Sequence, residues 1–342
     1  MKKIFAIFAV FCIMSMGACF SPWDGSDQGT IVINLENGGA RTLAEGDKYT
    51  VILTNSGETA ITEPITGLQY RRSLEPGLWN VLISRTNKDN KFNGYGEKDV
   101  EVVAGAVKSA SITVKTTDEN VTKVVNTWDE LRAVFEKNTS INETVIIIRD
   151  LSTHNSMNLE GKTWNITLRA DKNVTITNNS KETSLSLFRV LNNCQLTLDG
   201  SEGKITIDGN GGGYGHSLFL VQSGGQLTMK EGVTITNNKI TFTNPQRSGG
   251  VTVNGGTFTM LGGNISKNSA PYGGGVRVIS GTFIKTDGTI FGYTAGDSNS
   301  NRATAPGNQN GHAVYFDESN RENREDTAEP KNKFTNGSSW TL

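Results

Sequence analysis

A short motif recurs at nearly constant spacing through the second half of this 342-residue chain. Each copy is a five-residue stretch in which apolar residues alternate with polar ones, and successive copies begin 31, 31 and 25 residues apart. Internal repeats of this length are typical of solenoids, in which each repeat buries its apolar face only against its neighbours. The four copies are residues 194–198, 225–229, 256–260 and 281–285.

Two further families of short apolar segments run in step with the first. The segments that begin at Ile176, Ile207, Ile235 and Ile265 are 31, 28 and 30 residues apart, and a third family comprises 218–221, 251–253 and 276–278. Three short strands per repeat, each ended by glycine or asparagine, predict a right-handed parallel β-helix over residues 122–342. The insertions 240–247 and 293–309 fit this fold as surface loops, whereas they would disturb tandem hairpins.

Asparagine recurs at the end of one strand in each repeat. In a coiled stack, Asn179, Asn210, Asn238 and Asn268 are expected to lie above one another. Asparagine tolerates left-handed backbone geometry, and stacked side-chain amides can hydrogen-bond from one rung to the next. We therefore interpret these asparagines as structural residues and not as ligands.

A helix is predicted directly before the repeats, over residues 127–137. Thr127 and Glu130 form a capping-box signature, in which the threonine hydroxyl accepts from the Glu130 amide while the glutamate reaches back. Trp128, Leu131 and Phe135 then lie on one face of the helix. Such a helix is suited to cover the open apolar end of a β stack.

The region from residue 29 to residue 116 has a different pattern. Short apolar-polar alternations occur at 31–35, 49–53, 79–83, 99–103 and 111–114, with turn residues between them. This spacing predicts a small antiparallel β-sandwich. The complete chain is thus expected to be all-β, with a sandwich followed by a β-helix and its capping helix.

The N-terminus has the features of an export signal. Lys2 and Lys3 precede an apolar run that is too short to span a bilayer, and Gly17-Ala18-Cys19 follows it. Met-Gly-Ala-Cys is similar to the lipobox of bacterial lipoproteins, which implies cleavage after residue 18 and lipid on Cys19. Residues 19–28 then form a tether. The alternative is that Cys19, like Cys12, is an ordinary thiol of the signal peptide.

The repeat motif carries a resemblance to a known group of proteins. Gly-Gly-Thr-Phe-Thr-Met at 255–260, Gly-Gly-Asn-Ile-Ser-Lys-Asn at 262–268 and Pro-Tyr-Gly-Gly-Gly-Val at 271–276 resemble the repeats of bacterial surface lipoproteins with a pectate-lyase-like β-helix. Leu-Glu-Pro-Gly-Leu-Trp-Asn-Val at 74–81 resembles immunoglobulin-like and transthyretin-like modules of such proteins. The resemblance implies a protein anchored in the outer membrane or at the cell surface.

The net charge and the cysteine content argue against a nucleic-acid partner and against a disulfide framework. The formal charge is −1, and removal of Lys2 and Lys3 with the leader lowers it to −3, which argues against a nucleic-acid partner. The mature chain retains Cys19 and Cys194, so an intramolecular disulfide framework is not expected. Cys194 lies in a strand-like stretch and is interpreted as a small buried hydrophobic residue.

A polysaccharide lyase or glycoside hydrolase is the main enzymatic alternative, because the β-helix fold also hosts such enzymes. Glycoside hydrolysis needs two positioned carboxylates, and a calcium-dependent lyase needs clustered acids and a base. Asp199 and Asp208 are the acids that adjacent strands could bring near one another, but nothing supplies the rest of such a cluster, and His216 is the nearest candidate for a catalytic histidine. We interpret these three as ordinary structural or solvent-facing residues, and no catalytic residue is assigned.

No cofactor or metal is expected either. His154, His216 and His312 are scattered without metal-ligand spacing, and the glycine run 211–215 lacks the lysine of a phosphate-binding loop.

The remaining hypothesis is a non-catalytic adhesin or interaction scaffold that binds a host glycan or an extracellular protein. Repeated threonine, serine and asparagine side chains on long flat faces favour it, with Tyr272 as the best candidate for an exposed aromatic contact. Phe258 and Phe283 share one repeat phase and are expected in the core. A purely structural spacer in the cell envelope is the second alternative.

Overall fold

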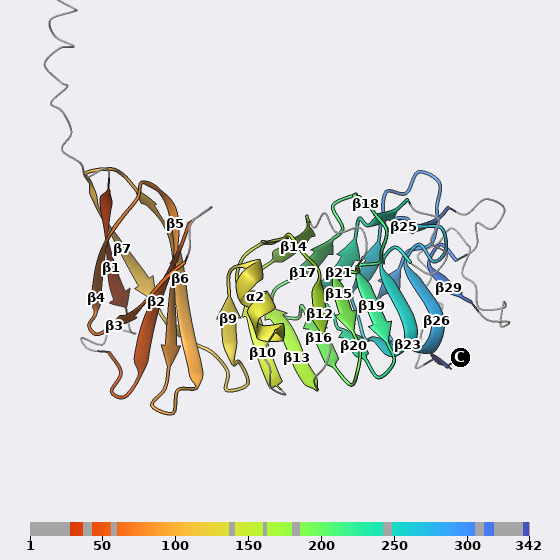
Figure 1. Ribbon diagram of the computed structural model, residues 1–342, viewed down its shortest axis with the longest axis horizontal. Helices are drawn as coiled ribbons and strands as arrows, with labels where there is room; N and C mark the ends of the chain where they lie inside the picture. The colour runs from red at the N-terminus through yellow and green to blue at the C-terminus, as the bar shows by residue number, and fades with distance from the viewer. Residues whose placement is uncertain are drawn as a thin grey trace, which may run out of the picture. The chain divides into compact units, whose positions relative to one another are not determined.

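The computed structural model describes residues 28–36, 43–55, 60–136, 141–159, 163–179, 185–241, 248–304, 311–317 and 338–341. The chain divides into two compact units, Met1–Asp118 and Glu119–Leu342, and both are mostly β in their described parts (Figure 1). The predicted leader 1–18, Cys19 and the rest of the predicted tether as far as residue 27 lie outside the described residues.

Unit 1 contains a five-stranded and a three-stranded sheet, which enclose an apolar core. Alternation places Val51, Val81 and Ile83 of the first sheet and Ile31 and Ile33 of the second in this core, all fully buried. The sheet orders are β3-β2-β5-β6-β8 and β4-β1-β7, with β1 Gly29–Glu36, β2 Lys48–Thr54, β3 Ile61–Ile65, β4 Gln69–Leu74, β5 Gly77–Thr86, β6 Phe92–Val102, β7 Val107–Thr113 and β8 Lys115–Thr116.

Unit 1 departs from the sequence expectation in two respects. Strands β3 and β4 were not predicted, because Pro64 interrupts the pattern of β3 and only Tyr70 and Leu74 of β4 are buried. In addition, β1 pairs with β7 in parallel, whereas all other strand pairs of this unit are antiparallel in the described residues. No hairpin links β1 to β7, so their relative direction is not fixed by a short turn.

Unit 2 consists mainly of three sheets of parallel strands. The six-stranded sheet contains β11 Leu151–Thr153, β14 Val174–Asn178, β17 Ile205–Asp208, β21 Val233–Thr236, β24 Asn264–Ser266 and β27 Thr289–Ile290. The four-stranded sheet contains β18 Gly213–Tyr214, β22 Lys239–Ile240, β25 Ser269–Ala270 and β28 Arg302–Ala303. The twelve-stranded sheet contains β9 Lys123–Val125, β10 Ile141–Ile147, β12 Met157–Leu159, β13 Trp164–Ala170, β15 Phe188–Val190, β16 Gln195–Asp199, β19 Phe219–Gln222, β20 Gln226–Met229, β23 Val251–Met260, β26 Val276–Lys285, β29 Val314–Phe316 and β30 Ser338–Thr341.

The registers between these strands coincide with the repeat spacing in the sequence. Leu196 pairs with Leu227, Leu227 with Phe258, and Phe258 with Phe283. The chain visits the sheets in a constant order and returns one strand further along each time, which is compatible with the expected β-helix. From β17 onward, the four-stranded sheet adds a fourth short strand to each repeat, where three were expected. Its strands have two residues each, too few to show a periodic pattern.

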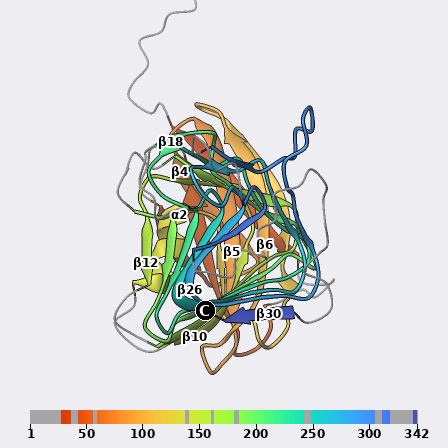
Figure 2. The same cartoon turned by 90° about the vertical axis from the view of Figure 1, so that its right-hand side faces the viewer.

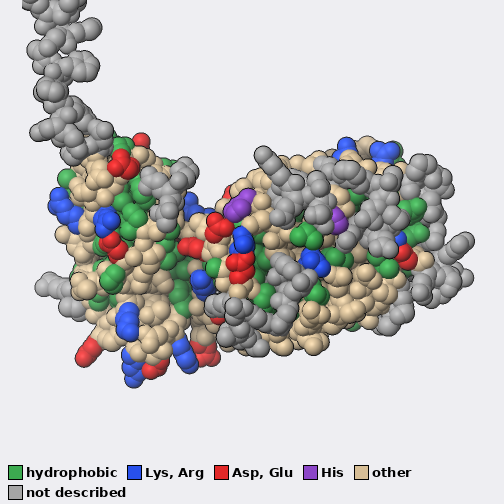
Figure 3. All heavy atoms as spheres, viewed as in Figure 1, with side chains coloured by type: hydrophobic (Ala, Val, Ile, Leu, Met, Phe, Trp, Pro, Cys, Tyr) green, Lys and Arg blue, Asp and Glu red, His purple; other side chains and the backbone are tan. Residues whose placement is uncertain are grey.

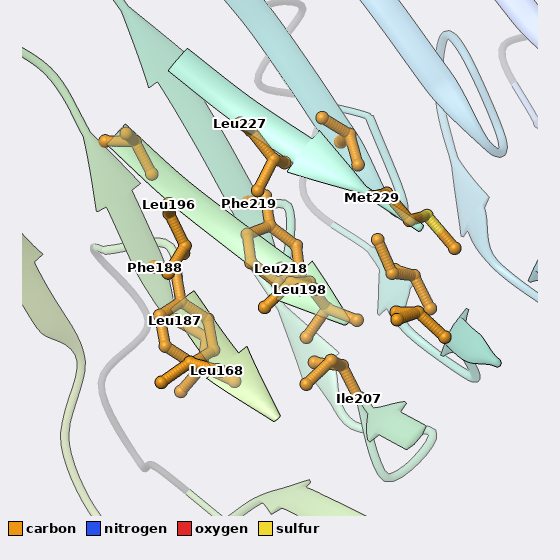
Figure 4. Packing of buried hydrophobic residues seen from close by; sticks show 14 of the residues in the cluster. Leu168, Leu187, Phe188, Leu196, Leu198, Ile207, Leu218, Phe219, Leu227 and Met229 are labelled. Carbon is orange, nitrogen blue, oxygen red and sulfur yellow. The ribbon is translucent and has the colours of Figure 1, made fainter. Parts of the chain in front are cut away.

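The interior of unit 2 is filled by rows of apolar side chains, one from each successive strand. Figure 4 shows part of this packing, including the rings of Phe188 and Phe219, which stack with centroids 4.9 Å apart. Phe258 and Phe283 stack in the same way at 5.2 Å and are fully buried, which confirms that they belong to the core. Cys194 is also fully buried in this cluster.

The helix expected before the repeats is present as α2, Trp128–Phe135. The Thr127 hydroxyl accepts from the Glu130 N–H at 3.2 Å, and the Glu130 carboxylate accepts from the Asn126 N–H at 2.8 Å. Trp128 packs edge-on against Phe188, and Phe135 packs against Trp164. The buried face of α2 therefore belongs to the same core as the first strands of the repeats.

The asparagines form hydrogen bonds between successive rungs, but the arrangement differs from the expected single stack. Asn238 and Asn268 are fully buried and continue to Asn301, which the sequence pattern did not single out because a longer insertion precedes it. Asn179 and Asn210 pair separately at the surface, at 2.7 Å. In these turns Asn210, Asn237 and Lys267 have a left-handed backbone conformation. Asn237 and Lys267 lie one residue before the buried Asn238 and Asn268.

At the C-terminal end of unit 2, β30 runs antiparallel beside the second half of β26 (Figure 2). The last residue of β26, Lys285, occupies the row formed by Leu198, Met229 and Met260 in the preceding strands. Lys285 is fully buried, and its amine has no hydrogen-bond partner among the described residues. Burial lowers the pKa of this amine below its ordinary value.

Candidate ligand-binding site

A paired arginine and aspartate lie at the last long strand of unit 2. Strand β26 pairs with β29 in parallel, which places Arg277 opposite Tyr315 and close to Asp317. Arg277 donates two hydrogen bonds to the Asp317 carboxylate, from Nε to Oδ1 at 2.6 Å and from Nη2 to Oδ2. This bidentate geometry fixes the plane of the guanidinium group.

Two tyrosine rings lie close to the same guanidinium group and to each other. Its central carbon lies 5.2 Å from the ring centroid of Tyr272 and 5.5 Å from that of Tyr315. The two rings are 5.3 Å apart and tilted by 48°. Arg277 is 5% exposed, and within the described part of the chain its buried Nη1 has no hydrogen-bond partner, while Tyr272 is partly exposed. Cation–π attraction thus adds to the ion pair in holding this group together.

A second set of rings adjoins the first across a glycine turn. The Tyr293 and His312 rings are 5.1 Å apart, and the Arg302 guanidinium carbon lies 5.6 Å from the Tyr293 centroid. A Cβ on Gly274 would lie 2.5 Å from the Arg302 backbone nitrogen and 2.6 Å from the His312 carbonyl oxygen. Only glycine therefore lets the turn pass this close to both residues. We call the combined set the tyrosine–arginine cluster: Tyr272, Arg277, Tyr293, Arg302, His312, Tyr315 and Asp317.

The orientation of His312 within the cluster is set by a backbone contact. Its Nδ1 accepts from the Ala303 N–H at 2.9 Å, so the neutral ring carries its proton on Nε2.

The cluster carries a net positive charge. Asp317 balances the charge of Arg277, and the exposed Arg302 leaves one positive charge in excess. Aromatic faces beside fixed donors can stack on a sugar ring and hydrogen-bond its hydroxyl groups.

The acids considered for catalysis have separate partners. Asp199 lies in β16 and Asp208 in β17, which belong to different sheets, so the expectation that they sit on adjacent strands is wrong. Asp199 accepts from Lys230 at 2.9 Å and from Ser201; burial works to raise its pKa, but these hydrogen bonds outweigh burial and lower it. Asp208 accepts from the Asn210 N–H and from the Asn237 side chain.

The histidines lie far apart in the fold. The His216 carbonyl accepts from the buried Asn238 side chain, and His154 lies 3.2 Å from Asp129 beside α2. Among the described residues, no group of three or more histidine, cysteine, aspartate or glutamate side chains is arranged to hold a metal ion.

The outward faces of unit 2 carry rows of threonine. In the twelve-stranded sheet Thr167, Thr197, Thr228 and Thr259 are in register. A second row in the six-stranded sheet contains Thr175, Thr206 and Thr234. Apart from the residues drawn in grey, much of unit 2 in Figure 3 is tan, the colour of the backbone and of the remaining side chains, with separate red, blue and green groups among it.

Of the cluster residues, sequence reasoning singled out only Tyr272 as a ligand contact. The sequence could have indicated Arg277 as a site residue, because it is a charged residue inside the apolar strand Val276-Arg-Val278. Its partner Asp317 and the neighbouring Tyr315 lie beyond an insertion of variable length, so no repeat spacing assigns them to the same place.

No protein-family model matches the chain, and no curated protein matches it. In the part of the chain that the structure describes, no helix has the length and apolar character needed to cross a membrane.

Proposed function

We propose that the chain is a lipid-anchored protein of the bacterial cell envelope that acts as a non-catalytic interaction scaffold. In this proposal unit 1 is an immunoglobulin-like or transthyretin-like β-sandwich, and unit 2 is a right-handed parallel β-helix of the pectate-lyase-like type. The export signal, the lipobox that ends at Cys19, and the repeat motif support this assignment. The predicted location is the outer membrane or the cell surface.

The ligand we propose is a glycan, bound at the tyrosine–arginine cluster. The observation that carries this proposal is the partly exposed Tyr272 ring, held 5.2 Å from a guanidinium group that Asp317 fixes in place. Rigid aromatic rings beside oriented donors lose little entropy on binding, which favours recognition of a sugar ring. The rows of uncharged threonine on the neighbouring sheets give a long glycan further hydrogen-bonding positions.

The arrangement of the aspartate side chains favours a binding role over a hydrolytic one. Asp199, Asp208 and Asp317 each form hydrogen bonds to a different neighbour, and the first two face outward from different sheets. A glycoside hydrolase needs two carboxyl groups facing one another across the bond to be cleaved. The proposal therefore assigns no catalytic residue and no cofactor.

A glycan array probed with the full chain and with Tyr272→Ala tests this proposal. We expect wild type to bind a restricted set of glycans and Tyr272→Ala to lose roughly tenfold or more in affinity for them, as expected for a stacking contact. Phe92→Ala, which removes a partly buried ring from unit 1, is the matched control and should bind as wild type does. Uniform absence of binding would favour a purely structural spacer, and equal loss in both variants would reject the cluster as the site.

A further inference from the structure

The three most exposed large hydrophobic side chains of the described residues lie at one end of unit 1. Leu78 is 61% exposed, Val107 is 59% exposed and Val103 is 42% exposed. Leu78 is the second residue of β5, Val103 directly follows β6, and Val107 begins β7. We call these three residues the aliphatic tip.

The backbone brings the three residues to the same end. The β5–β6 register places Leu78 opposite Glu101, two residues before Val103 on the same face of the strand. A tight turn then connects β6 to β7, closed by a hydrogen bond from the Ala106 N–H to the Val103 carbonyl at 3.1 Å. Val107 follows this turn immediately.

The polypeptide enters unit 1 at this same turn. The Gly105 N–H donates to the Gln28 carbonyl at 3.1 Å, and the Thr30 N–H donates to the Ala106 carbonyl at 2.8 Å. A Cβ on Gly29 would lie 2.3 Å from the Val103 carbonyl oxygen, so the entering strand is packed directly on the turn. The aliphatic tip therefore lies at the end of unit 1 where its described residues begin, at Gln28.

We propose that the aliphatic tip faces the membrane and inserts into the interfacial region of a phospholipid bilayer. This inference rests on the proposed lipid anchor at Cys19. Nine peptide bonds join Cys19 to Gln28, so the Cα of Gln28, beside the tip, is held within about 32 Å of the Cα of the anchored cysteine. Three aliphatic side chains bind a bilayer weakly by themselves, and the tether supplies the high effective concentration that makes this contact persistent.

The charged residues around the tip are compatible with a position among the lipid head groups. Glu101 lies opposite Leu78, and Lys108 directly follows Val107. Glu75 accepts from the Gln28 side chain at 2.9 Å. With both signs of charge close by, insertion does not require an anionic surface, and a bilayer rich in zwitterionic lipid is a suitable partner.

Fluorescence quenching by brominated lipid tests the inference on the lipidated full chain. Leu78→Cys and Val107→Cys are labelled with an environment-sensitive fluorophore and reconstituted into vesicles of phosphatidylethanolamine and phosphatidylglycerol, with or without brominated acyl chains. Leu261→Cys is the matched control, because Leu261 is an exposed leucine of unit 2. Cys194 is fully buried and takes up no label in the folded protein.

We expect labels at positions 78 and 107 to lose roughly half of their emission in brominated vesicles, as expected for groups at the boundary of the acyl chains. The label at position 261 should lose none. Equal emission at all three positions, in protein that floats with the vesicles, would overturn the membrane-facing tip and leave the anchor intact. Failure of the wild-type protein to float would overturn both the anchor and the tip.

Discussion

The side-chain oxygen of Asn301 accepts a hydrogen bond from the backbone N–H of Asn268 at 2.9 Å, although 33 residues separate them. The Asn268 side chain repeats this contact with the Asn238 N–H at 3.1 Å and also donates to the Ile235 carbonyl. Each asparagine thus satisfies backbone groups of the preceding turn that are buried away from water. The buried asparagines hold the turns of unit 2 at a fixed spacing.

Asn268→Ala is predicted to destabilise unit 2 strongly. The substitution leaves the Asn238 N–H and the Ile235 carbonyl without these partners, which costs about 2 to 4 kcal/mol in the free energy of unfolding. Asn179→Ala is the control, because the Asn179 side chain is exposed and its hydrogen bonds in the described residues are to the Ser152 and Asn210 side chains; its cost should stay below about 1 kcal/mol. Urea unfolding, followed by hydrogen exchange in residues 119–342, measures both. Similar losses in the two variants would contradict the structural role of Asn268.

Gly232→Ala is predicted to prevent close stacking of two turns. Gly232 has a φ of +72°, and a Cβ there would lie 1.9 Å from the Gly200 carbonyl oxygen. Gly296→Ala is the matched control, because Gly296 has a φ of +85° but no heavy atom within 4 Å of its Cβ position. Both variants incur about 1 kcal/mol of left-handed strain, and Gly232→Ala should lose roughly 3 kcal/mol or more in total. Equal thermal midpoints for the two variants would show that the steric contact is unimportant.

Asp317→Asn is predicted to cost about 2 to 3 kcal/mol, because it leaves the buried Arg277 without its counter-charge. The comparison is Glu202→Gln, which removes the partner of Arg169 at a position where the glutamate side chain is 57% exposed. That surface pair should contribute at most about 1 kcal/mol. Chemical denaturation measures the free energy of unfolding of both variants. A larger decrease for Glu202→Gln than for Asp317→Asn would be inconsistent with a buried Arg277–Asp317 pair.

Lys285→Met is predicted to stabilise the protein at neutral pH. Methionine continues the row of Met229 and Met260. The substitution also removes an amine that is buried without a hydrogen bond to any described residue, which should raise the free energy of unfolding by about 1 to 3 kcal/mol.

The pH dependence of this gain follows from the lowered pKa of Lys285. Between the folded-state pKa and the ordinary value of 10.5, the unfolded chain binds more protons, so wild-type stability rises with pH. The advantage of Lys285→Met is therefore largest at and below the folded-state pKa and shrinks toward pH 10.5. Unfolding of both proteins from pH 7 to 10 measures this difference, and a constant or growing advantage would contradict a depressed pKa.

Sequence periodicity predicted the strand registers of unit 2 well, because its parallel strands pair at the same spacing at which the local pattern repeats. The row from Leu196 to Phe283 was visible as 31, 31 and 25 residue steps, and these are the steps between paired residues. Capping chemistry also identified α2, since the Thr127 and Glu130 contacts are local in sequence.

Contacts between turns that insertions separate could not be predicted in this way. Asn301 and Asp317 reach their partners from beyond loops of irregular length, and the two-residue strands of the fourth ladder show no alternation. The parallel pairing of β1 with β7 likewise depends on tertiary packing rather than on a hairpin. For the candidate site, the sequence pointed to Tyr272 but not to the residues around it.

Metabolic labelling with palmitate tests the central claim, that this chain is a lipid-anchored scaffold at the cell surface. The full chain and Cys19→Ala are expressed in bacteria, labelled, and treated with protease as intact cells. The account predicts that wild type incorporates palmitate, that Cys19→Ala does not, and that protease cleaves the wild-type chain from outside. Absence of label from the wild-type protein would contradict the anchor and make the chain a secreted or periplasmic protein.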